Sequence, residues 1–419
     1  MKTSTLLRFL AGFSVLFLFN SCLKDHCTRT YTFYSPVYRT SAEVRANIKS
    51  AQPTPLEQGG KLFIKGQYIF LNEPDKGIHV IDNSNPASPK NISFIAIPGN
   101  MDMAVKGNTL YADLYTDLVA IDITDPLNVA VKQISENAFP QRIYSGGFIA
   151  DKTKVITDWE KRDTTVDFDC DTDLMWSGCA NCGFWLESSA FASADKAFNS
   201  PFGVGGSMAR FTILSSTLYT VTDDGLSVFS IASPQKPSFV SKINLGWGIE
   251  TIYPFKDKLF IGSNAGMFIY DASNPNQPTK LGQFTHATSC DPVIADDNYA
   301  YVTLRSGNTC QGFTNQMEVV NIKNLLNPSL VKTYQMTNPR GLSKDGNLMF
   351  ICDGTDGLRV YKADNVEMMT LQQQIKGPET FDVIAFNKVA IVSAKDGLYQ
   401  YDYSDPNNIK QLSRISYDK

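Results

Sequence analysis

Short hydrophobic runs recur along the chain at a near-constant spacing, and turns rich in Gly, Asn, Asp and Pro separate them. Seven segments share one order: a turn, often with Gly, a short β-rich run, an acidic or polar residue, and usually a Pro-containing loop. The residues that close these runs lie about 40 positions apart, except for one interval of 108 and one of 50. They are Asp82, Asp122, Ser230, Asp271, Asn321, Lys362 and Asp402. A fixed period with one large and one small insertion indicates a repeat protein.

Each repeat divides further into four short strands. The sixth contains the runs RGLSKDG, NLMFICD, LRVYKAD and MTLQQQI. Four strands in about 40 residues is the pattern of a propeller blade, and so small a sheet needs neighbouring blades to bury its faces. We therefore expect an all-β protein, a β-propeller of seven four-stranded blades over residues 56–419, rather than a linear β-solenoid. An eighth, degenerate blade is the alternative, because residues 142–168 contain two strand-like runs.

The repeats GIHVID and LVAID, followed by Ser/Thr-Asn/Asp-Pro, resemble the LVIVD-repeat family of bacterial and archaeal cell-surface propellers. The resemblance covers about residues 56–419 and implies the propeller fold, but little about function, since most members have none assigned. The third and sixth units depart from it, because Ser230 and Lys362 stand where the acidic residue usually lies. An acidic residue that can be replaced in this way is expected to cap a turn by accepting backbone N–H groups.

The first 21 residues have the pattern of an export signal. Lys2 and Arg8 precede a mostly apolar run, 9–19, that is too short to span a bilayer. Ser21-Cys22 resembles the lipobox of bacterial lipoproteins, in a relaxed form like that of Bacteroidota-type bacteria. The resemblance implies acylation of Cys22 and membrane attachment through that lipid, in the cell envelope. We expect the outer membrane, with display at the surface as one option; the alternative is a plain signal peptide with an incidental cysteine.

Residues 22–55 are expected to form a strap that leads from the lipid to the propeller. Thr40 and Glu43 have the spacing of a capping box ahead of AEVRANIK, which predicts a short helix.

The charge and motif content argues against several functions. The chain has 38 basic and 42 acidic residues without a basic stripe, so no nucleic-acid partner is expected. Its histidines are His26, His79 and His286, which leaves few places for the commonest general base. We find no G-x-S-x-G, no H-E-x-x-H, no P-loop and no Gly-rich dinucleotide turn, and we assign no catalytic residue.

Propeller topology places both insertions on one face. The innermost strand of each blade begins at the side that we call the top face, where the loop between its second and third strands also lies. The large insertion, about residues 137–206, joins two blades there, and the small one, 306–316, lies within a blade. Decoration of one face is how such scaffolds usually carry function.

Cysteine usage favours an oxidising compartment. Cys290 and Cys310 are predicted at the top of one blade, and we expect a disulfide between them. Cys352 lies in a predicted strand and is expected to be a buried free thiol.

The large insertion contains a Cys- and Asp-rich stretch. Cys179 and Cys182 have the spacing of a zinc knuckle or redox dithiol, with Cys170 as a third ligand, although a loop stapled by one disulfide is the simpler expectation. Four alternating carboxylates would repel one another unless a cation such as calcium were bound, and a solvated acidic loop is the default. They are Asp167, Asp169, Asp171 and Asp173. No cofactor is therefore expected, with calcium and zinc as the alternatives.

Aromatic side chains accompany this stretch and suggest a binding surface. They could stack on a sugar or anchor a partner, or they could pack the insertion onto the propeller. These residues are Trp176, Phe184 and Trp185.

The mouth of the central axis is the second candidate site. Five charged residues lie near the starts of predicted innermost strands: Asp102, Glu250, Asp291, Arg340 and Glu379. Such a ring could bind a polar ligand or a cation, or it could be a hydrated structural ring.

We expect a non-catalytic envelope lipoprotein that binds an unidentified protein or glycan through the top face. The alternative is an extracytoplasmic glycan-active hydrolase or lyase, in which Asp102 and Asp291 would act as acid and base. A metal or redox protein around Cys179 and Cys182 is a third hypothesis.

Overall fold

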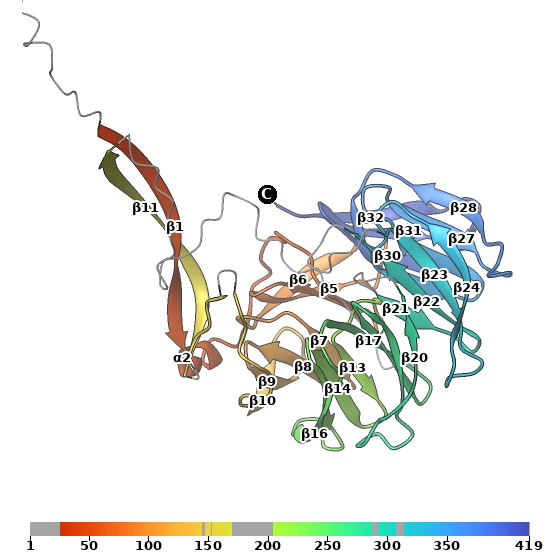
Figure 1. Cartoon of the computed structure of the whole chain (residues 1–419), viewed down its shortest axis with the longest axis horizontal. Helices are drawn as coiled ribbons and strands as arrows, with labels where there is room; N and C mark the ends of the chain where they lie inside the picture. The colour runs from red at the N-terminus through yellow and green to blue at the C-terminus, as the bar shows by residue number, and fades with distance from the viewer. Residues whose placement is uncertain are drawn as a thin grey trace, which may run out of the picture. The chain divides into compact units, whose positions relative to one another are not determined.

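The computed structural model describes residues 26–144, 147–151, 153–169, 204–286, 292–306 and 314–418. The chain divides into two compact units, and in the described residues these are a two-stranded ribbon and a β-propeller (Figure 1). The propeller has the seven blades that the repeat predicts, and each contains four antiparallel strands in sequence order. In the described part of the chain, no helix is long and apolar enough to cross a membrane.

The strands of each blade run from the axis outward. The innermost strands are β3 (Leu62–Lys65), β7 (Met103–Lys106), β13 (Phe211–Leu214), β17 (Ile249–Phe255), β21 (Val293–Ala295), β25 (Leu342–Asp345) and β29 (Thr380–Phe386). The second strands are β4 (Tyr68–Glu73), β8 (Thr109–Leu114), β14 (Thr217–Thr222), β18 (Lys258–Ser263), β22 (Tyr299–Leu304), β26 (Leu348–Cys352) and β30 (Val389–Ala394). The third strands are β5 (Gly77–Asp82), β9 (Asp117–Asp122), β15 (Gly225–Ser230), β19 (Gly266–Asp271), β23 (Gln316–Asn321), β27 (Leu358–Lys362) and β31 (Gly397–Asp402). The outermost strands are β6 (Lys90–Ala96), β10 (Ala130–Ser135), β16 (Ser238–Asn244), β20 (Thr279–Thr285), β24 (Ser329–Gln335), β28 (Thr370–Ile375) and β32 (Lys410–Ser416).

The ribbon accounts for the segment that suggested an eighth blade. Strand β11 (Lys154–Asp169) pairs with β1 (His26–Thr40), and together they form a separate two-stranded sheet. The hydroxyls of Thr30 and Thr165 lie 2.9 Å apart across it. Residues 154–168 of that segment therefore belong to a strand of the ribbon and not to a blade.

A helix and a short strand lead into the first blade. The helix α2 (Ser41–Arg45) has both bonds of the predicted capping box: the Glu43 N–H donates to Thr40 Oγ1 (3.2 Å), and the Thr40 N–H donates to Glu43 Oε2 (2.7 Å). Strand β2 (Lys49–Ala51) then pairs with β6 and covers the outer edge of that blade.

Aromatic side chains fill the space between blades. In six blades the third residue of the second strand is aromatic and at most 1% exposed: Phe70, Tyr111, Tyr219, Phe260, Tyr301 and Phe350. The Tyr111 hydroxyl donates to the Pro234 carbonyl (2.7 Å), and the Tyr219 hydroxyl donates to the Pro275 carbonyl (2.6 Å). Each proline lies in the loop between the third and fourth strands of the next blade, on the face opposite the top face. These hydrogen bonds therefore join neighbouring blades.

Five of the polar residues that close the third strands cap turns, as the sequence predicts for the acidic ones. In five blades the side chain accepts the backbone N–H two residues later at 2.8–3.0 Å. The capping residues are Asp82, Asp122, Asp271, Asn321 and Asp402.

A short strand from the large insertion helps to close the ring. Innermost strands contact one another in sequence order from β3 to β29, and β12 (Val204–Gly205) pairs with β3 while also contacting β29. Farther from the axis, the side-chain amides of Asn83 and Gln400 exchange two hydrogen bonds of 3.0 and 2.6 Å between the first and last blades. The ring therefore closes where three distant parts of the chain meet: the first blade, the end of the large insertion and the last blade.

Candidate functional site

The end of the large insertion lies among the innermost strands. β12 pairs with β3 of the first blade, with Val204 opposite Ile64 and Gly205 opposite Phe63. Two residues later, Ser207 Oγ accepts the backbone N–H of Leu342 in the sixth blade at 2.8 Å. The protein's own backbone therefore occupies the region where the ring of charged residues was expected.

Asp382 packs directly against this segment. The residue lies on β29 and is 1% exposed. A Cβ at Gly206 would lie 1.6 Å from its Oδ2, and a Cβ at Gly341 would lie 1.9 Å from its Oδ1. Glycine at these two positions makes room for the carboxyl group. Burial raises the pKa of Asp382 to about 7, against the opposing effects of the Val383 and Ser207 N–H groups and of the Lys61 charge.

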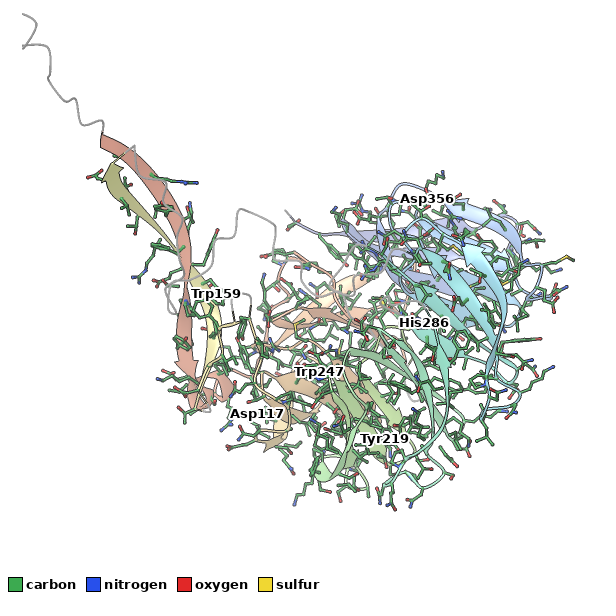
Figure 2. The ribbon with its side chains drawn as sticks, in the orientation of Figure 1. Asp117, Trp159, Tyr219, Trp247, His286 and Asp356 are labelled. Carbon is green, nitrogen blue, oxygen red and sulfur yellow. The ribbon has the colours of Figure 1, made fainter. Side chains whose placement is uncertain are left out.

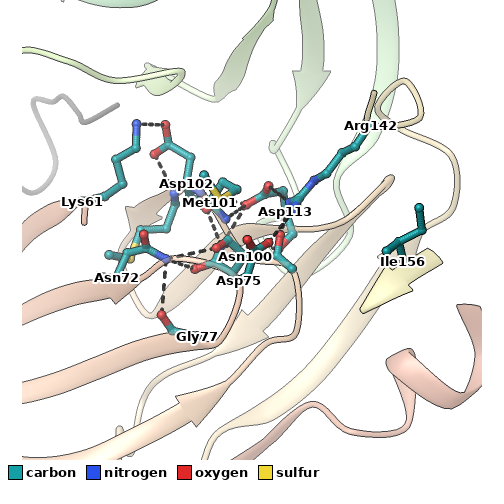
Figure 3. A network of polar contacts seen from close by, with 12 residues as sticks. Lys61, Asn72, Asp75, Gly77, Asn100, Met101, Asp102, Asp113, Arg142 and Ile156 are labelled. Carbon is teal, nitrogen blue, oxygen red and sulfur yellow. Dashed lines mark hydrogen bonds and ion pairs between the residues drawn. The ribbon is translucent and has the colours of Figure 1, made fainter. Parts of the chain in front are cut away.

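Asp102 holds the backbone where the chain runs from β12 into the third blade. Its Oδ1 accepts the Met103 N–H (2.7 Å), and its Oδ2 accepts the Arg210 N–H (2.8 Å). Lys61 Nζ lies 3.3 Å from Oδ2, and both side chains of this ion pair are only 3% exposed (Figure 3). Lys61 Nζ also donates to the Met208 carbonyl at 3.4 Å. A buried charge needs such partners, and here they fix the place where the insertion re-enters the propeller.

The structure brings together two other members of the predicted ring. Arg340 Nη2 lies 3.1 Å from Glu379 Oε1, and the guanidinium lies 4.4 Å from the centroid of the Phe381 ring. Lys395 Nζ lies 2.7 Å from the other oxygen of Glu379. Glu250 is half-buried on β17. These contacts agree with a structural role for Arg340 and Glu379.

A buried polar network between the first two blades was missed in the sequence. Asp113 Oδ1 accepts the N–H groups of Met101 and Asp102 and the side-chain amide of Asn100, all at 2.8 Å (Figure 3). Burial raises the pKa of Asp113, although the charge of Arg142 opposes the rise. Arg142 Nη2 lies 3.4 Å from Asp113, and its guanidinium lies 4.9 Å from the centroid of the Tyr115 ring. Arg142 comes from the start of the large insertion, so both ends of that insertion are held by buried carboxylates.

The histidine of the first blade also has a structural setting. His79 is fully buried, and its Nε2 lies 2.7 Å from Glu73 Oε2. Burial alone would raise the pKa of Glu73, but the bonds to His79 and Lys76 lower it overall.

Several predicted residues lie outside the described residues. They are Cys22, Cys170, Asp171, Asp173, Trp176, Cys179, Cys182, Phe184, Trp185, Cys290, Asp291 and Cys310. Asp167 is exposed on β11, which Asp169 ends. Within the described ranges, no three His, Cys, Asp or Glu side chains form a group that could hold a metal. Cys352 is the buried free thiol that the sequence predicts.

One exposed aromatic residue lies in a segment that matches no sequence motif. Trp247 is 81% exposed in the connection between β16 and β17, on the top face, and it is labelled in Figure 2. The available signal was its Gly-Trp-Gly context between two predicted blades, because an indole in a glycine turn has few neighbours to cover it.

Comparisons with known proteins agree with the repeat and the fold. The family model for the LVIVD repeat matches residues 60–94 and 99–135, which correspond to the first two blades. A comparison with curated protein sequences finds no match. A solved structure of a functionally unknown protein from Desulfotomaculum acetoxidans DSM 771 is 12% identical, with a TM-score of 0.51 over 85% of this chain and 95% of that chain.

A protein from Lactobacillus plantarum has the same identity and TM-score, over 86% of this chain and 97% of its own. At this identity, the similarity shows the fold alone. The chain therefore carries LVIVD repeats, and it folds as a seven-bladed β-propeller.

Proposed function

We propose that the protein is a non-catalytic lipoprotein of the cell envelope, whose propeller is a scaffold that binds an envelope protein or glycan through its top face. Acylation at Cys22 would attach it to the outer membrane. Both ends of the large insertion lie at the top face, because they connect the end of β10 to the start of β13.

The observation that carries the proposal is that two buried carboxylates near the innermost strands, Asp102 and Asp382, are occupied by structural contacts. Asp102 binds Lys61 and two backbone N–H groups, and Asp382 is enclosed by Gly206 and Gly341. A general acid or base must come within hydrogen-bond reach of the reacting group. Asp382 has the raised pKa that a general acid needs, but it is 1% exposed and the protein's own backbone occupies its surroundings. This arrangement favours a scaffold over a glycan-active enzyme.

Affinity enrichment from the native envelope tests the binding role. The full chain with a C-terminal tag would be compared with a variant that lacks residues 167–185. A protein or glycan that the full chain captures and the deletion loses would support binding through the insertion. Capture of the same molecules by both baits would show that the binding site lies outside residues 167–185. Capture of nothing by either bait would contradict the scaffold role.

Lipid attachment needs a separate test. Cells that express the full chain would be grown with labelled palmitate, beside cells that express Cys22→Ala. Label in the parent and none in the variant is the expected result. Equal labelling, or a parent protein that is released from membranes by salt alone, would contradict the anchor.

A further inference from the structure

The loop around Trp247 exposes an indole on the top face. Residues 245–248 connect β16 of the third blade with β17 of the fourth. Leu245 and Gly248 are half-buried, whereas the Trp247 side chain between them is 81% exposed. Exposed single hydrophobic residues are common, so exposure alone does not indicate a site.

Hydrogen bonds on both sides fix the position of this loop. The N–H groups of Leu245 and Ile249 donate to the carbonyls of Asp224 (3.0 Å) and Asp223 (3.2 Å). The Gly248 carbonyl accepts the N–H of Asn264 at 2.8 Å. Residues on either side of Trp247 are therefore held by the top loops of two blades. An aromatic side chain on a rigid backbone loses little conformational entropy when it binds a ligand.

The two glycines make this loop conformation possible. Gly246 and Gly248 have φ angles of 95° and 77°, a region that other residues rarely adopt. At Gly248 a Cβ would also lie 2.2 Å from the side chain of Asn264. Larger residues would be strained at both positions, so the sequence Gly-Trp-Gly favours the turn that exposes the indole.

Polar groups that form hydrogen bonds surround the base of the loop. Asp223 pairs with Arg210 at 2.6 Å, and Asp224 pairs with Lys242 at 2.9 Å. The side-chain oxygen of Asn244 accepts the Gly246 N–H at 2.9 Å. Each of these two carboxylates is therefore matched by a cation.

We propose that Trp247 and the polar residues at the base of its loop bind a pyranose ring of a neutral glycan. The apolar C–H face of a sugar ring stacks on an indole, while its hydroxyls exchange hydrogen bonds with carboxylate and amide groups. The balanced pairs Asp223–Arg210 and Asp224–Lys242 favour a neutral sugar over an acidic one. A protein partner is less suited to this surface, since protein hot spots gather several buried anchors in one apolar patch. The inference rests on the proposed function and narrows its ligand to a glycan.

The test measures binding of the full chain to an array of neutral and acidic oligosaccharides. We expect binding to at least one neutral member, with a blue shift of tryptophan fluorescence on titration with that sugar. Trp247→Ala should weaken this binding by about tenfold or more. The matched control is Phe239→Ala, which removes an aromatic residue that is 60% exposed on β16 of the same blade. This control should bind as the parent does.

The outcomes separate this inference from the proposed function. Binding to no neutral sugar, or equal binding by Trp247→Ala and the parent, would overturn the glycan site. If the array is negative while the envelope enrichment captures a protein, the scaffold role stands and the glycan assignment is wrong. If the enrichment and the array both capture nothing, the proposed function itself fails.

Discussion

Replacing Asp382 by Asn should change how the stability of the propeller depends on pH. Burial raises the pKa of this carboxyl group from an ordinary value of 3.8 to about 7 in the folded protein. Since a tenfold change in an acid dissociation constant is worth about 1.4 kcal/mol, the difference amounts to about 4 kcal/mol. Well below the ordinary pKa of 3.8 the group is protonated in both states and has no such cost. As the pH rises toward 7, the unfolded chain releases its proton while the folded chain keeps it, so the folded state loses stability.

The assay is chemical denaturation of the full chain, followed by circular dichroism, at pH values from 4 to 8. The free energy of unfolding of Asp382→Asn relative to the parent should rise by about 4 kcal/mol over this range and level off above pH 7. Asp345→Asn is the control, because bonds from Lys388 and Tyr403 lower the pKa of Asp345. Its difference from the parent should stay constant between pH 5 and 8. A constant difference for Asp382→Asn as well would refute the reasoning, since it would mean that the pKa of the carboxyl group is the same in the folded and unfolded protein.

Three further predictions concern the packing of the propeller. Gly206→Ala should destabilise the protein by about 3 kcal/mol, because the new Cβ would overlap the Asp382 carboxyl. In denaturation, the double variant with Asp382→Ala should lose less stability than the sum of the two single losses. Full additivity of the two losses would contradict the contact. Tyr219→Phe should cost about 1 kcal/mol, since it leaves a proline carbonyl of the next blade without its donor. Tyr111→Phe removes an equivalent bond and should cost a similar amount, so a loss in only one of the two would argue against a general interblade bond. Cys352, whose pKa burial raises well above its usual value, should resist iodoacetamide in the folded chain and react on denaturation; fast labelling at neutral pH without denaturant would show that the strand opens readily.

The blades were predictable because each is encoded locally. Four strands, their turns and the caps at Asp82 and its equivalents all lie within about 40 residues, so period and turn chemistry suffice to find them. The buried thiol of Cys352 followed from its position inside one of these strands.

The contacts that join distant segments were not predictable in the same way. The strand-like runs of residues 142–168 were visible, but the partner of Thr165 is Thr30, which lies 135 residues earlier in the chain. Likewise, the run around Gly206 has no hydrophobic period that would predict a strand beside β3. Asp102 was found from its place before an innermost strand, yet its partners Lys61 and Arg210 could be assigned only from the structure.

The position of β12 has a consequence for the order in which the molecule assembles. The strand pairs with β3, about 140 residues earlier, and contacts β29, about 175 residues later. Contacts between such distant segments form slowly, because the intervening chain must first be brought together. The first two blades can therefore form as soon as they leave the ribosome. The inner edge of the first blade is completed only after the end of the insertion and then the last blade have been synthesised. Until then the inner edge of β3 lies open, and a nascent chain would be most vulnerable to proteases and to wrong strand pairing in this interval.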